Sequence, residues 1–571
     1  MNGVYDFKNE NFVCVNETGE TFGDVIVKYK GNLFSEKQGD ILDGIAANLN
    51  DPKYIERLQG QFAFVIFDSR RKTLLLIRDH MGAVPLYYAT GPNRFIFGTS
   101  IKPILRELGG SATLNENIIH EYFMFRYVSG KDTFFKNIFE VKPGSMLRVD
   151  NLGRLSEEDY YSLRYSYDFA KDGSRSHEMF QEALSNSFSL QTQDKYERNI
   201  GVLSSGGIDS SILVSYFRRL ARSRFRTYYV GFEGYEHNRL DEVNRLSKLC
   251  NTDQENVLIS NEHYSDNLIE TIKINEEPLN HPCSVALKYL YERIKGEMEI
   301  LLSGEGADCL YCGYFVFNLI NWLYVKNPVR FLSLPFGKMV EVLLGGRKGR
   351  GKVDKVIAAL TLPPDAYTIY HGDFPYNTKE GVDNLLMARF PVTFAENYVP
   401  GLSNYSKKNV LDLILKLYQT HFLVEELNTL SKLGNNYGIE SRYPFIDIKM
   451  IDLFNSFPWR ERIELLRRKH QVHAIAKKCL PKEILEKPKE GFGVPLYSWF
   501  YDGKGLGRFM GLLNDRRTRE RGVFEVAYLE KLLDDYQNRH LSDDSFECII
   551  WPIINFELWN RIFVDKKPVG Y

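Results

Sequence analysis

Residues 204–211 read Ser-Ser-Gly-Gly-Ile-Asp-Ser-Ser; they follow an apolar run at 199–203 and precede an apolar helical pattern at 212–220. This order predicts a buried strand, a glycine-rich turn and a helix. The two glycines let the backbone approach an anion closely, and the helix start directs its amides at it. Asp209 would repel that anion unless Mg²⁺ bridged the two. The stretch therefore predicts a phosphate-binding loop that works with Mg²⁺, the alternative being a turn that binds no ligand.

The loop lacks the lysine that a Walker loop carries after its second glycine. It resembles instead the loop of the ATP pyrophosphatases, which reads S-G-G-x-D-S and holds the β,γ-pyrophosphate of ATP while the substrate takes AMP. The matching residues are Ser205, Gly206, Gly207, Asp209 and Ser210. The resemblance implies ATP and Mg²⁺ as cofactors. It is shared by asparagine synthetases, argininosuccinate synthetases, GMP synthetases and tRNA-thiolating enzymes.

A second segment separates the members of this superfamily. A short apolar run at 300–302 leads into Ser-Gly-Glu-Gly-Ala-Asp at 303–308, and Gly-Tyr follows at 313–314. A strand that ends in such a turn lets backbone lie against a nucleotide at the carboxyl edge of a parallel sheet. The segment resembles S-G-E-G-x-D-E-x-F-x-G-Y of the asparagine synthetases, with Cys309 at the usual glutamate and Tyr311 at the usual phenylalanine.

This resemblance implies roles for particular side chains. Asp308 joins Asp209 on Mg²⁺, and Glu305 lies near the reacting carbonyl, where it takes a proton from the attacking amine. Lys469 stands where the family has a lysine that stabilises the leaving pyrophosphate and the acyl-adenylate, although His473 replaces the arginine that is usual nearby. The residues implied around the adenosine are Ser204, Val230, Ser303 and Gly304. The alternative interpretation is that Glu305 and Lys469 are surface charges without a catalytic role.

Further segments extend the resemblance over nearly the whole chain. Residues 438–447 resemble the family segment G-x-E-x-R-x-P-F-L-D, and residues 487–496 resemble R-P-K-x-G-F-x-x-P-L. The resemblance also places residues 241–242 and 277–278 at positions that recur in the synthetase fold of the family. The relatives that form β-lactams or carbapenams have tyrosine at the position of Glu305. Glu305 therefore favours amide synthesis between two molecules over ring closure.

Residues 1–165 alternate short β-rich runs with turns, which is typical of a sheet-rich domain. The segments at 58–68, 78–88 and 97–102 resemble the class II glutamine amidotransferase domain, and 141–144 resembles its closing P-P-G turn. The resemblance implies an α+β N-terminal nucleophile-type sandwich with α-β-β-α layers.

Glutamine hydrolysis in that class depends on a cysteine that becomes the first residue, whose thiolate attacks the amide with the free α-amine as base. Here that position is Asn2, and Cys14 lies too far along the chain. The stretch before Gly23 has no R-L-x-I motif, and Tyr-Lys-Gly-Asn at 29–32 stands where F-N-G-E is expected; Gly-Asp at 39–40 is retained. We therefore expect a structural platform without glutaminase activity.

A polar, charged stretch at 165–177 predicts a linker between a degenerate amidotransferase-like domain at 1–165 and a synthetase domain at 176–571. Strand patterns, which alternate with helical ones, lie at 199–203, 227–232 and 255–259. Alternation of this kind predicts an α/β parallel sheet. From about Val316 the pattern is largely helical, so the resemblance implies an ATP-pyrophosphatase domain with a helical C-terminal part.

The charge and composition of the chain limit the classes of partner that we expect it to bind. Lys plus Arg number 73 against 74 Asp plus Glu, which favours neither nucleic acid nor an anionic membrane. The basic, glycine-rich run at 345–355 is interpreted as a solvated loop. The first residues lack the features of a signal peptide, and no stretch approaches the roughly 20 apolar residues of a membrane span, so we expect a cytoplasmic protein. Cys309 and Cys312 have no second ligand pair for zinc.

These patterns predict ATP-dependent amide synthesis through an acyl-adenylate, with release of AMP and pyrophosphate, as in asparagine synthetases but without glutaminase activity. One alternative is a specialised natural-product, lasso-peptide or glycan amide ligase or cyclase. Another is a catalytically silent nucleotide-binding or regulatory homologue. The expected partners are a small-molecule or peptide carboxylate and an amine or ammonia, with a homodimer left open. The acyl substrate and amine stay unidentified, because the pocket walls come from scattered positions in the helical part.

Overall fold

A computed structural model describes residues 1–9, 11–15, 18–34, 38–49, 51–165, 175–194, 198–321, 376–377, 379–390, 410–464, 468–485 and 492–566. The basic run at 345–355 lies outside the described residues, as do residues 166–174 of the expected linker and 487–491 of one family segment. Within the described part of the chain, no helix is long and apolar enough to cross a membrane.

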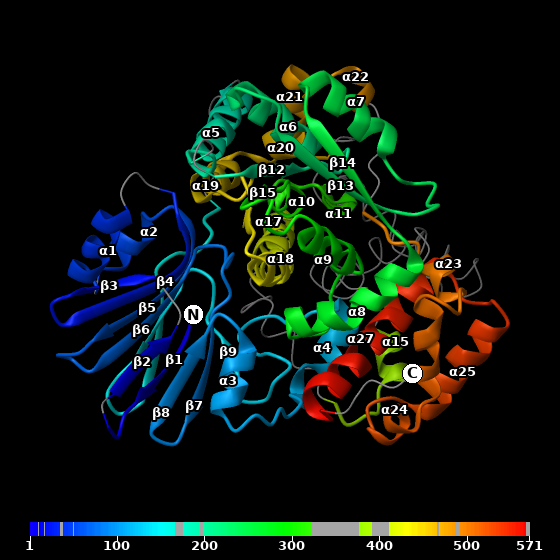
Figure 1. The fold of residues 1–571 in the computed structure, drawn as a ribbon, viewed down its shortest axis with the longest axis horizontal. Coiled ribbons are helices and arrows are strands. Elements are labelled where there is room, and N and C mark those ends of the chain that lie inside the picture. Colours follow the sequence, from blue (N-terminus) through cyan, green and yellow to red (C-terminus); the bar gives the residue numbers. More distant parts are fainter. Residues whose placement is uncertain are drawn as a thin grey trace, which may run out of the picture.

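The N-terminal part contains two antiparallel sheets (Figure 1), with the strand orders β2-β1-β8-β7-β9 and β11-β10-β6-β5-β4-β3. The strands are β1 (Asn2–Asp6), β2 (Asn11–Val15), β3 (Gly19–Phe22), β4 (Val25–Leu33), β5 (Gly60–Asp68), β6 (Thr73–Arg78), β7 (Tyr87–Gly91), β8 (Arg94–Gly98), β9 (Phe139–Glu140), β10 (Ser145–Val149) and β11 (Leu155–Asp159). Two β-rich runs of this region, at 61–67 and 73–77, form the adjacent strands β5 and β6.

Strand β5 is buried on both faces, which explains why its sequence is apolar without alternation. Val65 and Phe67 face the other sheet and share a core with Tyr5 of β1 and Phe97 of β8. On the opposite face, the side chains of residues 62, 64 and 66 share a core with helices α1 (Gln38–Ala47) and α2 (Pro52–Glu56). Helix α3 (Ile101–Glu107) packs on β7 and β8 of the other sheet, and α4 (Ile119–Phe125) belongs to the large core that continues into the C-terminal part.

A five-stranded parallel sheet forms the centre of the C-terminal part, in the order β14-β13-β12-β15-β16. Its strands are β12 (Ile200–Leu203), β13 (Arg226–Phe232), β14 (Asp253–Ile259), β15 (Ile300–Leu302) and β16 (Glu440–Arg442). The predicted parallel sheet is therefore present. Strand β16 was not predicted, because three residues inside a largely helical region carry no periodic pattern; it pairs with β15 along its whole length.

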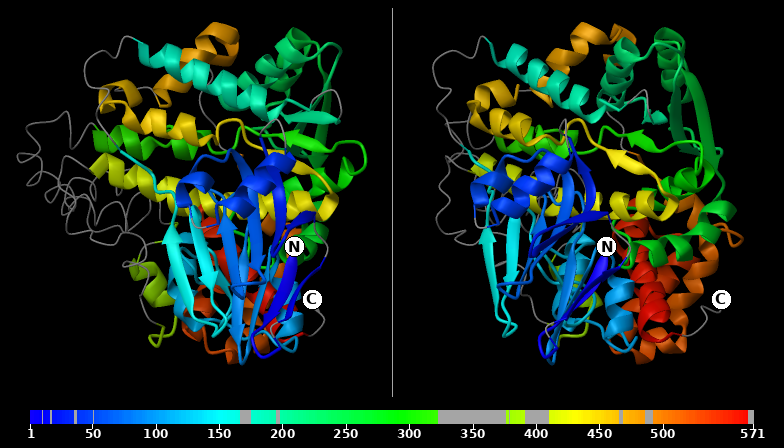
Figure 2. Two further views of the ribbon diagram at one scale, coloured as in Figure 1. Left: turned by 90° about the vertical axis from the view of Figure 1, so that its left-hand side faces the viewer. Right: turned by 60° about the vertical axis from the view of Figure 1, so that its left-hand side comes forward.

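Outside this sheet, the described part of the C-terminal region is largely helical. Their bounds are α5 (Ser176–Gln191), α6 (Ile208–Leu220), α7 (Leu240–Cys250), α8 (Asn261–Asn275), α9 (Cys283–Arg293), α10 (Ala307–Leu310), α11 (Phe315–Ile320), α15 (Lys379–Leu385), α17 (Val410–Leu417), α18 (Leu423–Tyr437), α19 (Ile448–Ser456), α20 (Trp459–Arg462), α21 (His470–Cys479), α22 (Lys482–Leu485), α23 (Leu496–Phe500), α24 (Arg516–Glu520), α25 (Val526–Gln537), α26 (Asp543–Ser545) and α27 (Trp551–Trp559). In Figure 2 the orange and red C-terminal helices lie beside the blue strands. Tyr122 of α4 donates a hydrogen bond to the Pro552 carbonyl in α27 at 3.2 Å, so the last helices pack directly on the N-terminal part.

The order of the parallel strands reverses between β12 and β15. Strand β12 comes first in the chain, β13 and β14 are added on one side, and β15 is added on the other. At such a reversal the loops that follow the two strands diverge and leave a crevice at the carboxyl edge of the sheet. Those loops are residues 204–207 and 303–306, the two segments that the sequence analysis selected.

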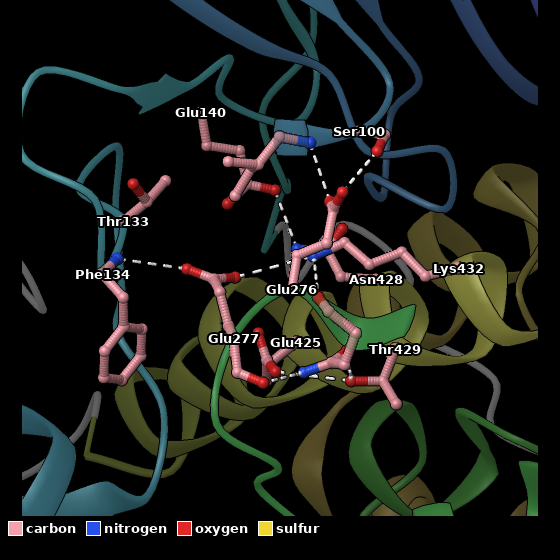
Figure 3. Close-up of polar contacts among 12 residues, drawn as sticks. Ser100, Thr133, Phe134, Glu140, Glu276, Glu277, Glu425, Asn428, Thr429 and Lys432 are labelled. Atoms are coloured by element: carbon pink, nitrogen blue, oxygen red, sulfur yellow. Dashed lines mark hydrogen bonds and ion pairs between the residues drawn. The ribbon is translucent and has the colours of Figure 1, made fainter. Parts of the chain in front are cut away.

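Buried acidic side chains join the N-terminal part to the C-terminal part (Figure 3). Glu276, which ends α8 in a left-handed conformation, accepts hydrogen bonds from Ser100 Oγ at 2.5 Å, Ile101 N at 2.7 Å and Lys102 N at 2.9 Å. Its carboxylate therefore caps the first turn of α3 in the other domain. Glu277 accepts a further bond from a backbone N–H of the N-terminal part at 3.2 Å.

A second inter-domain contact centres on Arg78, which is fully buried. Its guanidinium pairs with Glu140 at 2.6 Å and donates to Asn428 Oδ1 of α18 at 2.7 Å. Asn428 in turn donates to Glu140 at 2.8 Å. Because removing one partner would leave a buried charge uncompensated, these groups hold the domains in one arrangement.

We expect Glu276→Ala to lower the free energy of unfolding by about 2–4 kcal/mol, because three donors of the other domain lose a charged acceptor. Urea unfolding followed by circular dichroism measures this loss. Glu270→Ala, on the exposed side of the same helix, is the matched control and is expected to change stability by less than about 0.5 kcal/mol. Equal stability of the two variants would contradict an inter-domain role for Glu276.

Candidate active site

A cavity of about 660 Å³ lies against the two loops at the strand reversal. Every residue that the sequence analysis assigned to the site lines this cavity: Ser204, Ser205, Gly206, Gly207, Asp209, Ser210, Val230, Ser303, Gly304, Glu305, Asp308 and Lys469. These residues come from the loop after β12, the start of α6, strand β13, the loop after β15, α10 and the residue before α21. Segments up to 265 residues apart in the chain (469 minus 204) thus form one site.

The first loop is closed by its own serines. Ser205 N donates to Ser210 Oγ at 3.1 Å, and that hydroxyl donates to the Gly207 carbonyl at 3.2 Å. Gly206 has a φ of +72°, which favours glycine, and a Cβ there would lie 3.1 Å from the Cβ of Arg239. The resulting turn leaves backbone amides available to an anion at the start of α6.

The surroundings of the loop fit a nucleotide. The Ser204 hydroxyl is buried and, among the described residues, has no hydrogen-bond partner, so a polar ligand group would satisfy it. A Cβ on Gly304 would lie 3.1 Å from Ser210 N, which shows how closely the second loop approaches the first turn of α6. Helix α6 begins at Ile208, four residues before the predicted start, and this puts Asp209 in its first turn.

Lys469 bridges the two carboxylates that the family resemblance assigns to Mg²⁺. Its ammonium pairs with Asp209 and lies 2.9 Å from Asp308 Oδ1. Burial opposes the charge of Lys469, but the two carboxylates outweigh it and raise the pKa of this lysine above its usual value. A Cβ on Gly313 would fall 2.0 Å from Asp308 Oδ1 and 2.5 Å from Lys469 Cε, so only glycine leaves room for this bridge.

The two carboxylates that meet at Lys469 are suited to bind Mg²⁺ together with phosphate oxygens. In the part of the chain that the structure describes, no group of three or more His, Cys, Asp or Glu side chains is arranged to enclose a metal. Mg²⁺, however, commonly takes one or two protein carboxylates and completes its shell with water and substrate phosphates. Asp209 and Asp308, brought together on one ammonium group, supply that number of carboxylates.

Glu305 faces the same cavity from the second loop. Burial raises the pKa of Glu305, whereas hydrogen bonds from Gly306 N, at 3.3 Å, and from the Glu426 carboxyl lower it. Its backbone N–H donates to Ser303 Oγ at 3.2 Å, which fixes the turn. A carboxylate whose pKa moves toward neutrality is suited to accept a proton at physiological pH.

An aromatic wall, which the sequence analysis did not identify, lines the rest of the cavity. The His281 ring lies 5.3 Å from Phe422 and 6.2 Å from Tyr376, and Tyr314 lies 6.0 Å from Phe422. Burial lowers the pKa of His281 to about 3, so this ring is neutral. Cys283 also lines this part. Tyr314 belongs to the Gly-Tyr pair at 313–314 that the family segment contains. The other residues of the wall lie in separate segments that carry no local pattern: His281, Cys283, Tyr376 and Phe422.

The family segment at 438–447 supports the site without lining the cavity. Arg442 pairs with Asp194 at 2.7 Å and with Glu440, which fastens β16 to the end of α5. The Arg442 carbonyl accepts a bond from Ser303 N at 2.9 Å. The segment therefore positions the second loop by way of the sheet.

Comparison with known families agrees with this architecture. The family model described as asparagine synthase matches residues 179–561, and the one described as a glutamine amidotransferase domain matches residues 45–161. The fold and the two family matches together define an amide-forming ligase with an amidotransferase-like N-terminal domain. The chain belongs to the asparagine synthase family, because the first match covers more than half of it. This confirms the resemblance drawn from the segments at 204–211 and 303–308.

Individual relatives are distant but extend over most of the chain. The chain is 23% identical over 530 residues to the glutamine-hydrolyzing asparagine synthetase 1 of Bacillus subtilis strain 168, covering 90% of this chain and 79% of the relative. It is 23% identical over 534 residues to a putative glutamine-hydrolyzing asparagine synthetase of Mycobacterium tuberculosis strain H37Rv, covering 90% and 78%. Similarity to the amidase chry2 of Gibberella zeae is 23% over 504 residues, covering 78% and 71%.

We expect Lys469→Ala to lower the free energy of unfolding by about 3 kcal/mol in the presence of EDTA, because two adjacent carboxylates lose their shared cation. Added Mg²⁺ should recover more stability in this variant than in the wild type. Thermal and urea unfolding measure both effects. Lys477→Ala, at an exposed position of α21, is the control and should leave stability unchanged. A Lys469→Ala variant as stable as this control would contradict the bridge.

Proposed function

We propose that the protein is an ATP-dependent, AMP-forming amide ligase that activates a carboxylic acid as an acyl-adenylate and transfers the acyl group to an amine or ammonia. One observation carries the proposal: a phosphate-binding loop, two carboxylates, a buried lysine and Glu305 line a single cavity. The family match and relatives named as asparagine synthetases support amide synthesis as the class of reaction.

In the first step an oxygen of the substrate carboxylate attacks the α-phosphorus of ATP, and the bond from that phosphorus to the bridging oxygen breaks. The amides and hydroxyls of residues 205–210 hold the departing pyrophosphate. Lys469 stabilises the charge that grows on the phosphate oxygens. Mg²⁺, held by Asp209 and Asp308, would neutralise phosphate charge. The products are an acyl-adenylate and pyrophosphate.

In the second step the amine nitrogen attacks the acyl carbon, and the bond between that carbon and the AMP oxygen breaks. The Glu305 carboxylate accepts the proton that the nitrogen loses. The raised pKa of Glu305 makes it a better base for this transfer than an exposed glutamate would be. Amide, AMP and a protonated Glu305 result, and the proton then passes to solvent.

The proposal includes no glutamine hydrolysis. Asn2 pairs with Gly98 at the start of β1, and its carboxamide cannot serve as the nucleophile that the amidotransferase reaction needs. Residues 29–32 are paired with β5 throughout, as part of the sheet. We propose that this domain serves as a platform, docked through Glu276 and Arg78, and that the nitrogen donor reaches the synthetase cavity as a free amine or ammonia.

A specialised ligase is a second candidate, favoured by the aromatic wall. Among the described residues that line the cavity, the Arg and Lys side chains are Arg239, Arg468 and Lys469. Arg239 donates to the Gly206 carbonyl at 3.3 Å and Lys469 pairs with Asp209 in the first turn of α6, so these two charges lie at the phosphate loop. A neutral His281 and its aromatic neighbours suit an apolar or aromatic acyl group better than the second carboxylate of aspartate.

Pyrophosphate release from ATP and Mg²⁺, measured over a panel of carboxylic acids, tests the proposal and separates the candidates. Aspartate with ammonium is one arm, and aromatic and apolar acids with ammonium or small amines are the others. We expect Glu305→Gln to lower amide formation by about 10²- to 10⁴-fold, since the amine loses its base. Glu270→Ala is the control. If the wild type releases no pyrophosphate with any acid but still binds ATP, this result would favour a catalytically silent nucleotide-binding protein.

Glutamine should not replace ammonium. We expect the rate of glutamate release from glutamine to equal the background without protein, measured by a coupled glutamate assay, because the first strand offers a carboxamide in place of a thiolate. Amide formation in the same tube should begin when ammonium is added. Release of glutamate above background would overturn this part of the proposal.

A further inference from the structure

The N-terminal domain reaches the wall of the cavity at the end of helix α4. Tyr376, which lines the cavity, and Asn377 both donate backbone hydrogen bonds to the Met124 carbonyl, at 2.9 and 3.1 Å. Met124 belongs to α4 and to the segment at 45–161 that matches the amidotransferase domain. One part of the aromatic wall is therefore attached to the backbone of the amidotransferase-like domain.

Arg126, which caps the C-terminus of α4, lies over the Tyr376 ring. Its guanidinium carbon is 3.2 Å from the centre of the ring, and its side chain is fully buried. A guanidinium group over an aromatic face is attracted by the electrons of the ring, and the attraction is strongest where water is excluded. Arg126 has a φ of +66°, in the left-handed region that residues with a Cβ rarely adopt. Such a conformation persists where tertiary contacts compensate it, as the contact with the ring does here.

The Arg126 guanidinium group has one ionic partner, and its other nitrogens need compensation. Nη1 donates to Glu547 Oε1 at 3.1 Å and to the Glu547 carbonyl at 3.3 Å. Nε and Nη2 are buried and have no hydrogen-bond acceptor among the described residues. Because burying such donors without an acceptor costs free energy, the electron-rich face of Tyr376 compensates them. The cation and the ring therefore stabilise each other, and the position of the ring depends on Arg126.

A displacement of Tyr376 would change the whole aromatic wall. The rings of Tyr376 and His281 are 6.2 Å apart and meet edge to face, and His281 meets Phe422 in the same way at 5.3 Å. The charge of Arg126 adds to burial in lowering the pKa of His281, so that this ring stays neutral. Among the described residues that line the cavity, Tyr376 is present and Arg126 is not. Arg126 therefore influences the cavity through the rings of the wall.

We propose that Arg126 is a positioning residue for the acyl pocket, one that holds the Tyr376 ring in the cavity wall and so determines which carboxylic acids bind. This inference rests on the proposed function and adds to it. The amidotransferase-like domain then has a role in substrate selection besides its role as a platform. The acids that depend most on Arg126 are those whose aromatic or apolar group packs against Tyr376.

The Michaelis constant for the acid tests this role. With the acid that the wild type uses best, Arg126→Met should raise KM for that acid by about 10-fold, the effect of losing a desolvated cation–π contact. KM for ATP should stay within about 2-fold, since uniform binding of ATP is not altered. In a Tyr376→Ala background, Arg126→Met should change KM for the acid by less than about 2-fold, because a residue that acts through the ring has no effect once the ring is gone.

Arg389→Met is the matched control. The Arg389 guanidinium carbon lies 4.8 Å from the centre of the Phe390 ring, but its side chain is half exposed, and neither residue is among the described residues that line the cavity. KM for the acid should be unchanged in this variant. Arg126→Lys guards against loss of folding, because it keeps a charge beside Glu547 and loses only the planar group. It should raise KM for the acid several-fold while its melting temperature stays closer to that of the wild type than the melting temperature of Arg126→Met.

Two outcomes overturn the inference and leave the proposed function intact: an unchanged KM for the acid in both Arg126 variants, or an equal rise of KM with and without the Tyr376 ring. A wild type that releases no pyrophosphate with any acid makes the proposed function fail by itself. Fluorine NMR of the full chain with fluorotyrosine at position 376 then still decides whether Arg126 holds the ring. We expect one resonance in the wild type and in Arg389→Met, and a broadened or divided resonance in Arg126→Met. Identical spectra of all three proteins would overturn the inference.

Discussion

The Lys469 ammonium group, buried between the carboxylates of Asp209 and Asp308, is the interaction on which the site depends. It ties the first turn of α6, the short helix α10 and the start of α21 to one point. Lys469 itself has a φ of +52°, an uncommon conformation for a residue with a Cβ, and its backbone N–H donates to the Cys312 carbonyl at 3.3 Å. Backbone strain of this kind persists only where surrounding contacts compensate it, as the two carboxylates do here.

Buried charge is also compensated in the N-terminal domain, within a segment that resembles the amidotransferase class. Asp79 accepts backbone hydrogen bonds from Met81 at 3.1 Å, Ala83 at 2.9 Å and Val84 at 2.9 Å, so the segment at 78–88 builds a turn. The adjacent Arg78 pairs with Glu140 and reaches α18. The residues of this segment thus have structural roles that do not depend on glutamine. Helix α18 contacts both regions, because Glu425 and Asn428 lie among the buried contacts between the domains (Figure 3), whereas Glu426 lines the cavity.

Much of the architecture could be predicted where a local pattern exists. The apolar runs at 199–203, 227–232 and 300–302 became neighbouring parallel strands, and the glycine-rich segments after two of them became the loops of the site. Strand β16 could not be predicted, because it is short and is defined by pairing with β15. The start of α6 was placed too late, since Ile208 to Ser211 were treated as turn, whereas the helix begins directly after Gly207.

The sequence alone determined the family and the segments at 204–211 and 303–308 that line the cavity, because the residue types and spacing of each segment are set by local backbone geometry. Only the tertiary structure decided that Lys469 bridges Asp209 and Asp308, and that an aromatic wall with a neutral His281 lines the same cavity. These relations join segments more than a hundred residues apart. Their charges and protonation follow from burial and from partners that meet only in the folded chain, and no local spacing encodes either.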